Sequence, residues 1–260
     1  MGNYLSAECY KAVHRKYIYI FSAAMLGLVA AFMLLLRVEG MSQSGDGMLM
    51  VQRVSVSELL GILAMALSAG LYFLMIAADI VFSDQYKYNT LKNEVSYGLP
   101  RWQIYLGKLT ASALTAGILC LVLMGGYIGI GCVLFPAGED FGTNLATFAK
   151  WLLIALPLWL GGLGFFNMLQ FLIKGSNAAT VFYVMVVFLG SGFMDLMEVF
   201  LPALQPMADL IRTISLNTPF ILLRTQSPES VMAYAWALGM AWLTVSTIIG
   251  AISFQKKEIS

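Results

Sequence analysis

The chain contains six apolar segments, each near the 20 or so residues that an α-helix needs to cross the hydrocarbon core of a bilayer. They cover residues 17–36, 59–82, 105–134, 151–173, 178–201 and 231–254. Hydrophobic residues make up 60% of the chain and charged residues 11%, whereas soluble domains average about 45–50% and about 25%. One soluble core of this size has no room for so much apolar surface. The sequence therefore predicts an all-α membrane protein with six transmembrane helices.

A short polar segment, residues 1–16, precedes the first apolar segment. Within it, a helix over residues 3–16 would place Leu5, Cys9, Ala12 and Val13 on one face and the polar residues elsewhere. This pattern predicts an amphipathic helix that lies in the membrane interface. A disordered basic tail is the alternative interpretation.

The loop between the second and third apolar segments is unusually polar and carries four cations, Lys87, Lys92, Arg101 and Lys108. Its sequence predicts a helix over residues 84–96 that ends at Gly98, followed by a new helix from Pro100. Glycine is favoured just past the end of a helix and proline near the start of the next. A membrane protein needs no such structure merely to turn the chain round. We therefore expect this loop to contact a partner on the cytoplasmic side.

The cations of the loops predict the orientation, because cytoplasmic loops carry an excess of lysine and arginine. With six spans, both termini lie on one side. The terminal side has ten cations: Lys11, Arg15, Lys16, Lys87, Lys92, Arg101, Lys108, Lys174, Lys256 and Lys257. The other side has five: Arg37, Arg53, Lys150, Arg212 and Arg224. Both termini are therefore expected in the cytoplasm.

The three loops on the other side differ in character. Residues 38–57 are polar and contain Gly and Ser, which favours a flexible loop, and residues 135–149 are expected to form a short acidic turn region. The longest loop, residues 202–230, is expected to hold one or two short helices that dip into the outer leaflet or cap a dimer. Four of its apolar residues recur at helical spacing: Met207, Leu210, Ile211 and Ile214.

Catalytic and cofactor motifs are absent from the sequence. His14 is the only histidine, so no Ser-His or Cys-His pair can form within the membrane. The chain lacks GxSxG, HExxH and the phosphate-binding G-x-x-x-x-G-K-[ST] pattern. The three cysteines, Cys9, Cys120 and Cys132, have no metal-ligand spacing. We expect no catalysis, no cofactor and no metal in this chain, and a net charge of +1 gives no indication of nucleic-acid binding.

Three acidic residues fall at the edges of apolar segments, where a charge is costly unless it is paired or hydrated. Asp79 either reaches interfacial water or a nearby lysine, or links the second span to the loop helix through Lys108 or Arg101. Asp195 and Glu198 lie one helical turn apart. They mark either a break where the fifth span leaves the membrane or a polar substrate path.

The loop resembles the permease subunits of ABC-2 type transporters. These have an amphipathic elbow helix, six spans and a coupling helix between spans two and three. Their loop carries an acid, a Gly-Thr-[Leu/Ile/Val]-Lys-like run, a Gly-x-[Ser/Pro]-Arg step and a lysine in span three. The matching positions are Asp84, Asn89-Thr90-Leu91-Lys92, Gly98-Leu99-Pro100-Arg101 and Lys108, with Asn89 where glycine is common. Glu8-Cys9-Tyr10-Lys11 and Arg15-Lys16 are similar to the opening of the family.

This resemblance implies one ABC-2 type transmembrane domain over residues 1–260, with an elbow helix (1–16), a cytoplasmic coupling loop (83–104) and an extracellular loop (202–230). It implies a permease subunit of a bacterial plasma-membrane exporter, similar to lantibiotic-immunity and bacitracin-type exporters. Two permease subunits, identical or homologous, would form a substrate path for an amphiphilic molecule within the lipid membrane. Separate ATPase subunits would bind ATP and Mg²⁺. The implied ATPase-coupling residues are Tyr86, Lys87, Asn89, Thr90, Leu91, Lys92, Gly98, Pro100 and Arg101.

Two other function classes stay open on the sequence. A non-transporting scaffold or sensor subunit would explain the spans but would leave the structured loop without a role. An intramembrane enzyme would have to work without the common catalytic sets. An ATPase subunit that copurifies with the chain would distinguish the permease from both.

Overall fold

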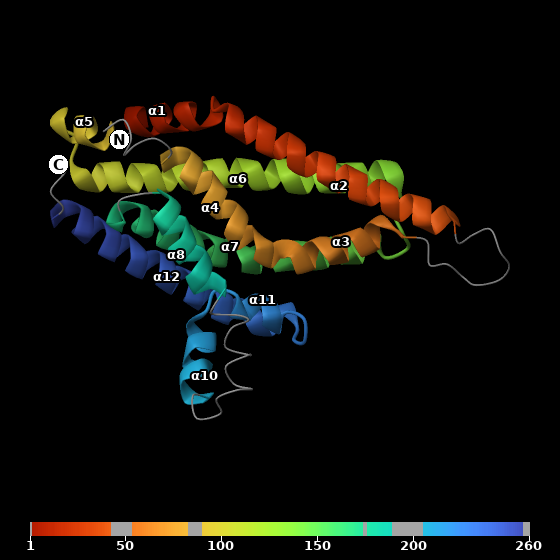
Figure 1. Ribbon diagram of the computed structural model, residues 1–260. Helices are drawn as coiled ribbons and strands as arrows, with labels where there is room; N and C mark the ends of the chain where they lie inside the picture. The colour runs from red at the N-terminus through yellow and green to blue at the C-terminus, as the bar shows by residue number, and fades with distance from the viewer. Residues whose placement is uncertain (1, 43–53, 83–89, 174–175, 189–204, 257–260) are drawn as a thin grey trace.

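The computed structural model describes residues 2–42, 54–82, 90–173, 176–188 and 205–256, and every regular element in these ranges is helical (Figure 1). In chain order they are α1 (Gly2–Val13), α2 (Lys16–Ser42), α3 (Val56–Met65), the 3₁₀ helix η2 (Ala66–Ala69), α4 (Gly70–Phe82), α5 (Thr90–Ser96), α6 (Arg101–Leu134), α7 (Phe141–Leu172), α8 (Ser176–Phe188), α10 (Gln205–Ile214), α11 (Thr218–Leu222) and α12 (Pro228–Lys256). The predicted all-α fold is confirmed for this part of the chain.

Within the residues that the structure describes, five helical runs are long and apolar enough to cross a bilayer, so the chain has the make-up of a multi-pass membrane protein. They are α2, the continuous run α3–η2–α4, α6, α7 and α12. The predicted fifth span, residues 178–201, is described only as far as α8, a shorter apolar helix. The start of α1, α5 and the end of α12 lie at one end of the bundle (Figure 1).

The second span begins three residues earlier than predicted, because a capping box fixes its start. The Ser55 hydroxyl accepts a hydrogen bond from the backbone N–H of Glu58, and the Glu58 carboxylate accepts one from the backbone N–H of Ser55 at 3.1 Å. These bonds satisfy two donors that a helix start leaves open. The span is also interrupted at its middle by η2, which the continuous apolar pattern does not predict. The indole N–H of Trp159 donates to the Leu67 carbonyl in this break at 3.1 Å.

The prediction of a turn region over residues 135–149 is wrong for its second half, because α7 already begins at Phe141. The first turns of α7 are polar on one side. Their average hydropathy is therefore too low to count them with the predicted apolar segment 151–173. The other side packs inward: Phe148 is buried in the main core, and the Asn144 amide donates to the Ser57 hydroxyl of α3. The buried face, not average hydropathy, sets this helix start.

The core is built around α7 and α12, which run side by side in the same direction. Lys150 pairs with Glu229 near their beginnings at 3.0 Å, and Phe171 contacts Phe254 near their ends with ring centroids 4.6 Å apart. Between them lies Gly239, where an added Cβ would stand 2.3 Å from the carbonyl carbon and oxygen of Pro157. Small residues allow such close backbone contact in membrane helices.

The loop over residues 202–230 was expected to hold one or two short helices, and its described part contains two, α10 and α11. The segment between them reaches into the bundle. The Trp242 indole N–H donates to the Ile214 carbonyl at 2.7 Å, and Trp242 is the middle residue of α12. Leu216 is buried in the main core. The tip between α10 and α11 therefore lies at the level of the centre of α12, deeper than a surface loop.

Candidate functional site

The structure confirms the predicted turn after the loop helix. The backbone N–H of Gly98 donates to the Val95 carbonyl at 3.0 Å, and Gly98 has a φ of 82°. A side chain at that angle is strained, so glycine suits the position. Pro100 is the N-cap of α6. The turn therefore fixes the direction of α5 relative to α6.

The inner face of α5 packs against the protein itself. Leu91 is only 5% exposed and belongs to a cluster with Phe82 of α4 and Ile104 of α6. Phe171 of α7 extends the cluster, with its ring 4.9 Å from that of Phe82 and 4.8 Å from that of Tyr105. A displacement of α5 would therefore act on α4, α6 and α7 together.

The outer face of α5 and the following turn are open. Lys92, Asn93 and Ser96 are exposed, and the Tyr97 side chain is 88% exposed. An aromatic residue surrounded by polar groups at the end of a membrane bundle is suited to a protein contact, since tyrosine is enriched at the energetic centres of interfaces.

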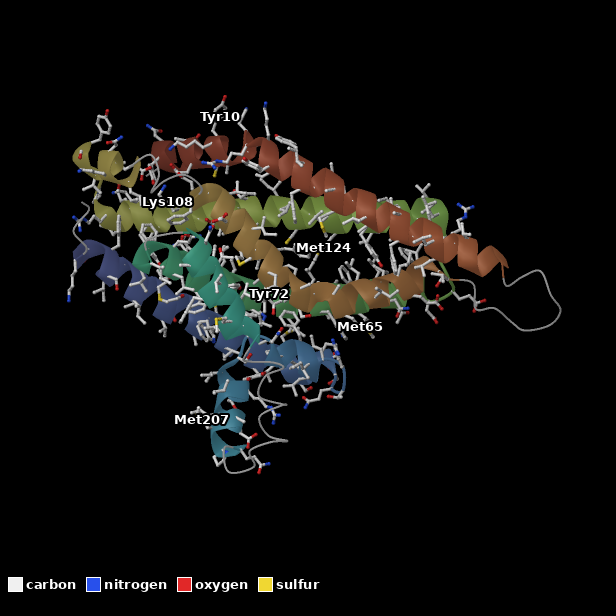
Figure 2. All side chains as sticks on the ribbon, viewed as in Figure 1. Tyr10, Met65, Tyr72, Lys108, Met124 and Met207 are labelled. Atoms are coloured by element: carbon white, nitrogen blue, oxygen red, sulfur yellow. The ribbon has the colours of Figure 1, made fainter. Side chains whose placement is uncertain are left out.

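Beneath α5, a buried charge network joins three helices around Lys108 of α6. The Lys108 ammonium lies 3.2 Å from Glu8 Oε2 of α1 and 3.5 Å from Glu94 Oε1 of α5. The Tyr4 hydroxyl of α1 donates to Glu94 Oε2 at 2.9 Å, and the Lys11 ammonium lies 2.7 Å from Glu8 Oε1. Figure 2 labels Lys108 where α1, α4 and α6 approach one another. The network locks α1 and α5 to the start of α6.

Burial makes this network electrostatically costly to disturb. The side chains of Lys108 and Glu8 are 0% and 2% exposed. Burial by itself raises the pKa of Glu8, but the charges of Lys108 and Lys11 more than offset this and hold the pKa below its ordinary value. Burial, followed by the charges of Glu8 and Glu94, raises the pKa of Tyr4, which therefore stays a hydrogen-bond donor.

The lowered pKa of Glu8 predicts a loss of stability in acid. The Glu8 ion pair stabilises the fold above the unfolded pKa of a glutamic acid, about 4.3, and this contribution disappears as the pH falls through the lower folded pKa. We expect wild type to melt above Glu8→Gln at about pH 7 and the difference to close below about pH 4. Thermal melts of both proteins across this range measure it. A difference that stays constant in acid would contradict the assignment.

Arg101 ties the turn to the last helix. Its guanidinium donates to the carbonyls of Phe254 at 3.0 Å and Gln255 at 2.7 Å, in the last turn of α12. The terminal carbonyls of a helix have no partner inside the helix and favour a cation. The end of the turn is thereby fastened to α12.

Asp79 contacts α7. Its Oδ1 accepts a hydrogen bond from the amide of Gln170 at 3.3 Å. The Lys108 ammonium, one of the partners considered for Asp79, contacts Glu8 and Glu94. The carboxylate also borders a cavity together with Arg15. Asp79 therefore links α4 to α7 through this hydrogen bond.

The structure describes only part of the predicted coupling set. Thr90 begins α5, Leu91 faces inward, and Lys92, Gly98 and Pro100 are exposed. A Leu91→Asp variant would therefore disturb the protein's own core and is no clean test of partner docking. Five predicted site residues lie outside the described ranges: Tyr86, Lys87, Asn89, Asp195 and Glu198.

Several residues of this junction, among them Glu8, Glu94 and Tyr97, were not predicted as site residues from the sequence. Glu8 and Lys108 are 100 residues apart, so no local pattern pairs them. The only available signal was the isolation of each acid in its segment, since Glu8 is the single acid of α1 and Glu94 the single acid of α5.

Among the described residues, no group of three or more His, Cys, Asp or Glu side chains is placed to hold a metal ion. No protein-family model matches the chain, and no curated protein is similar to it at a significant level. The class of protein must therefore be inferred from the junction of α1, α5 and α6 and from the span pattern.

Proposed function

We propose that the chain is the membrane permease subunit of an ATP-binding cassette exporter, an ABC-2 type permease moved by a separate ATPase. The observation that carries the proposal is the arrangement of α5. One face is packed and ion-paired to the bundle, and the other presents Lys92 and Tyr97 outward. Such a helix suits the transfer of force from a partner into the spans.

The direction of the helices supports six crossings. Because α7 and α12 run the same way, we propose that the chain between them crosses the membrane in the opposite direction, beginning with α8. Together with the five long helices, this would make six crossings, with α1 as the elbow helix and both termini on the side of α5.

The partner chains follow from what this chain lacks. It has no phosphate-binding motif, so ATP and Mg²⁺ would bind in the ATPase subunit. A second permease, identical or homologous, would complete an export path for an amphiphilic substrate such as a lantibiotic or a drug. The excess of loop cations on the side of α5 supports a cytoplasmic position for this helix, and the membrane of the proposed exporter would be a bacterial plasma membrane.

A Tyr97→Asp variant tests the docking surface. Tyr97 is almost fully exposed, so we expect a normal melting temperature but a loss of binding to the ATPase subunit. Truncation of an interface anchor costs about 2 kcal/mol or more, which is roughly a 30-fold rise in Kd. Copurification of the ATPase with the tagged permease, and ATP hydrolysis by the complex, measure the effect.

The matched control is Tyr10→Asp on α1. Tyr10 is 65% exposed, lies near the same end of the bundle as α5 and stacks on His14 (Figure 2). It should leave the complex intact. Equal loss in both variants would indicate a general effect of charge near the membrane, and unchanged binding in Tyr97→Asp would move the docking surface elsewhere.

A further inference from the structure

An apolar cavity of about 320 Å³ lies between α2, the run α3–η2–α4, α6 and α7. On α6 its lining residues recur every three or four positions over three turns: Ala116, Leu119, Cys120, Leu123, Met124 and Tyr127. Residues with this spacing form one continuous face of a helix. Figure 2 labels Met124 between α2 and α3. The cavity therefore runs along the helix axes, and we call it the α2–α6 slot.

The slot has the shape of a single hydrocarbon chain. From Ala116 to Tyr127 the helix rises about 16 Å, at 1.5 Å per residue, and each leaflet contributes about half of the roughly 30 Å hydrocarbon core. The volume of the slot, spread over this length, leaves a mean cross-section of about 20 Å². A helix with its side chains is about 10–12 Å across, which is a cross-section of about 80 Å² or more. The slot is therefore too narrow for a helix of a partner subunit, whereas a linear chain fits.

The walls of the slot offer a ligand no hydroxyl, N–H or charged side chain that is free to bind it. Among the described residues that line it, Tyr127 and Trp159 alone carry a hydroxyl or N–H group, and none is charged. The Tyr127 hydroxyl donates to the Leu59 carbonyl at 3.1 Å, and the Trp159 indole N–H donates to the Leu67 carbonyl at 3.1 Å. A polar ligand would lose its hydrogen bonds to water on entering and gain none in return. The slot therefore favours a ligand that is apolar along its whole buried length.

The rims of the slot belong to surfaces that face the bilayer. On one rim, Ile62 and Ala66 of α3 and η2 are exposed. On the other rim, Met25 and Val29 belong to α2, which the other helices bury very little. All of these helices are long apolar runs of the kind that cross a membrane. The hydrocarbon around such runs consists of lipid acyl chains, so a chain can enter from the side without leaving the membrane.

We propose that the α2–α6 slot holds one acyl chain of a bilayer phospholipid, aligned with the spans. The chain lies against Phe73, Met124 and Trp159 and fills the space between α2 and the interrupted second span. The slot recognises the chain and not the headgroup, because its described walls carry no charge. This proposal does not depend on the proposed export function.

Photo-labelling of the full chain in phosphatidylcholine liposomes tests the proposal. A small fraction of the lipid carries a diazirine in the middle of one acyl chain, and mass spectrometry locates the labelled residues. Val245 and Ile248 of α12 serve as the reference, because they are 55% and 58% exposed and contact only passing lipid. We expect labelling of the slot residues about tenfold above this reference, which corresponds to a binding preference of about 1.4 kcal/mol.

Variants that fill the slot should remove this excess. Ala66→Phe places a ring at the rim, and it should lower the labelling of Leu123 and Met124 to about the reference level. Val29→Phe, on the other rim, serves as a second filling variant should the first fold poorly. The matched control is Val122→Phe, on the same helix and at the same depth, because Val122 is 44% exposed and lies outside the slot. The control should keep the excess.

The choice of the acyl chain as the recognised part is tested with a second headgroup. Phosphatidylglycerol with the same diazirine-bearing chain should label the slot residues to the same extent as phosphatidylcholine does. A strong preference for one headgroup would overturn this assignment. Equal labelling of the slot and of the reference residues on α12 would mean that only passing lipid contacts the protein, and it would overturn the site. An excess that both filling variants leave unchanged would overturn it as well.

Discussion

Lys108→Met is expected to destabilise the protein more than any other single substitution in the junction of α1, α5 and α6. Methionine fits the space of the lysine stem, but it leaves the negative charge of Glu8 buried without the positive charge of Lys108. Removing one partner of a buried ion pair costs about 3–5 kcal/mol. A melting curve of the purified protein should show a large fall in melting temperature, and α1 should become accessible to protease.

The double variant Glu8→Gln/Lys108→Met separates the ion pair from simple packing. It removes both charges, and so it should be more stable than Lys108→Met alone. Lys11→Met is the matched control, because Lys11 contacts the same carboxylate but is 56% exposed, and it should change the melting temperature little. If the double variant is no more stable than the single one, the pair does not hold α1 in place.

Gly239→Ala should have the second large effect on stability. Replacing a helical glycine by alanine usually stabilises a protein, but here the substitution should destabilise it. The new methyl group would stand 2.3 Å from backbone atoms of Pro157, and backbone atoms cannot swing aside as a side chain can. Overpacking of this kind typically costs about 1–3 kcal/mol. α7 and α12 would have to separate at the centre of the bundle. Melting temperature and yield of the monodisperse protein measure the cost.

The matched control is Gly129→Ala on α6, where an added Cβ meets nothing within 4 Å. That substitution should be neutral or stabilise the helix by up to about 1 kcal/mol. Similar effects at both glycines would mean that α7 and α12 do not approach as closely as the structure places them.

The sequence predicted the features that depend on local chemistry. The apolar segments located all five long helices, because burial in lipid requires a run of about 20 apolar residues whatever the neighbours are. Gly98 and Pro100 marked the end of one helix and the start of the next, because their backbone preferences act within a few residues. The paired Ser55 and Glu58 carry an equally local signal, because a capping box marks the start of a helix.

The remaining features depend on contacts between distant segments. The start of α7 at Phe141 follows from the packing of Phe148, which average hydropathy does not register. The inward face of Leu91 depends on Phe82 and Ile104. The ion pair of Glu8 with Lys108 forms only once α1 lies on α6. These contacts need the three-dimensional arrangement.

In the proposed function, α5 and the turn at Gly98 would receive motion from a nucleotide-hydrolysing subunit. The most direct measurement is site-specific photo-crosslinking from position 97 in cells that express the full chain at its natural level, followed by mass spectrometry of the product. We expect a covalent product with a cytoplasmic ATPase subunit, and no such product when the crosslinker is placed at Tyr10. If a reactive group at position 97 instead reacted only with reagents added outside intact cells, α5 would lie outside the cell and the proposed function would be contradicted.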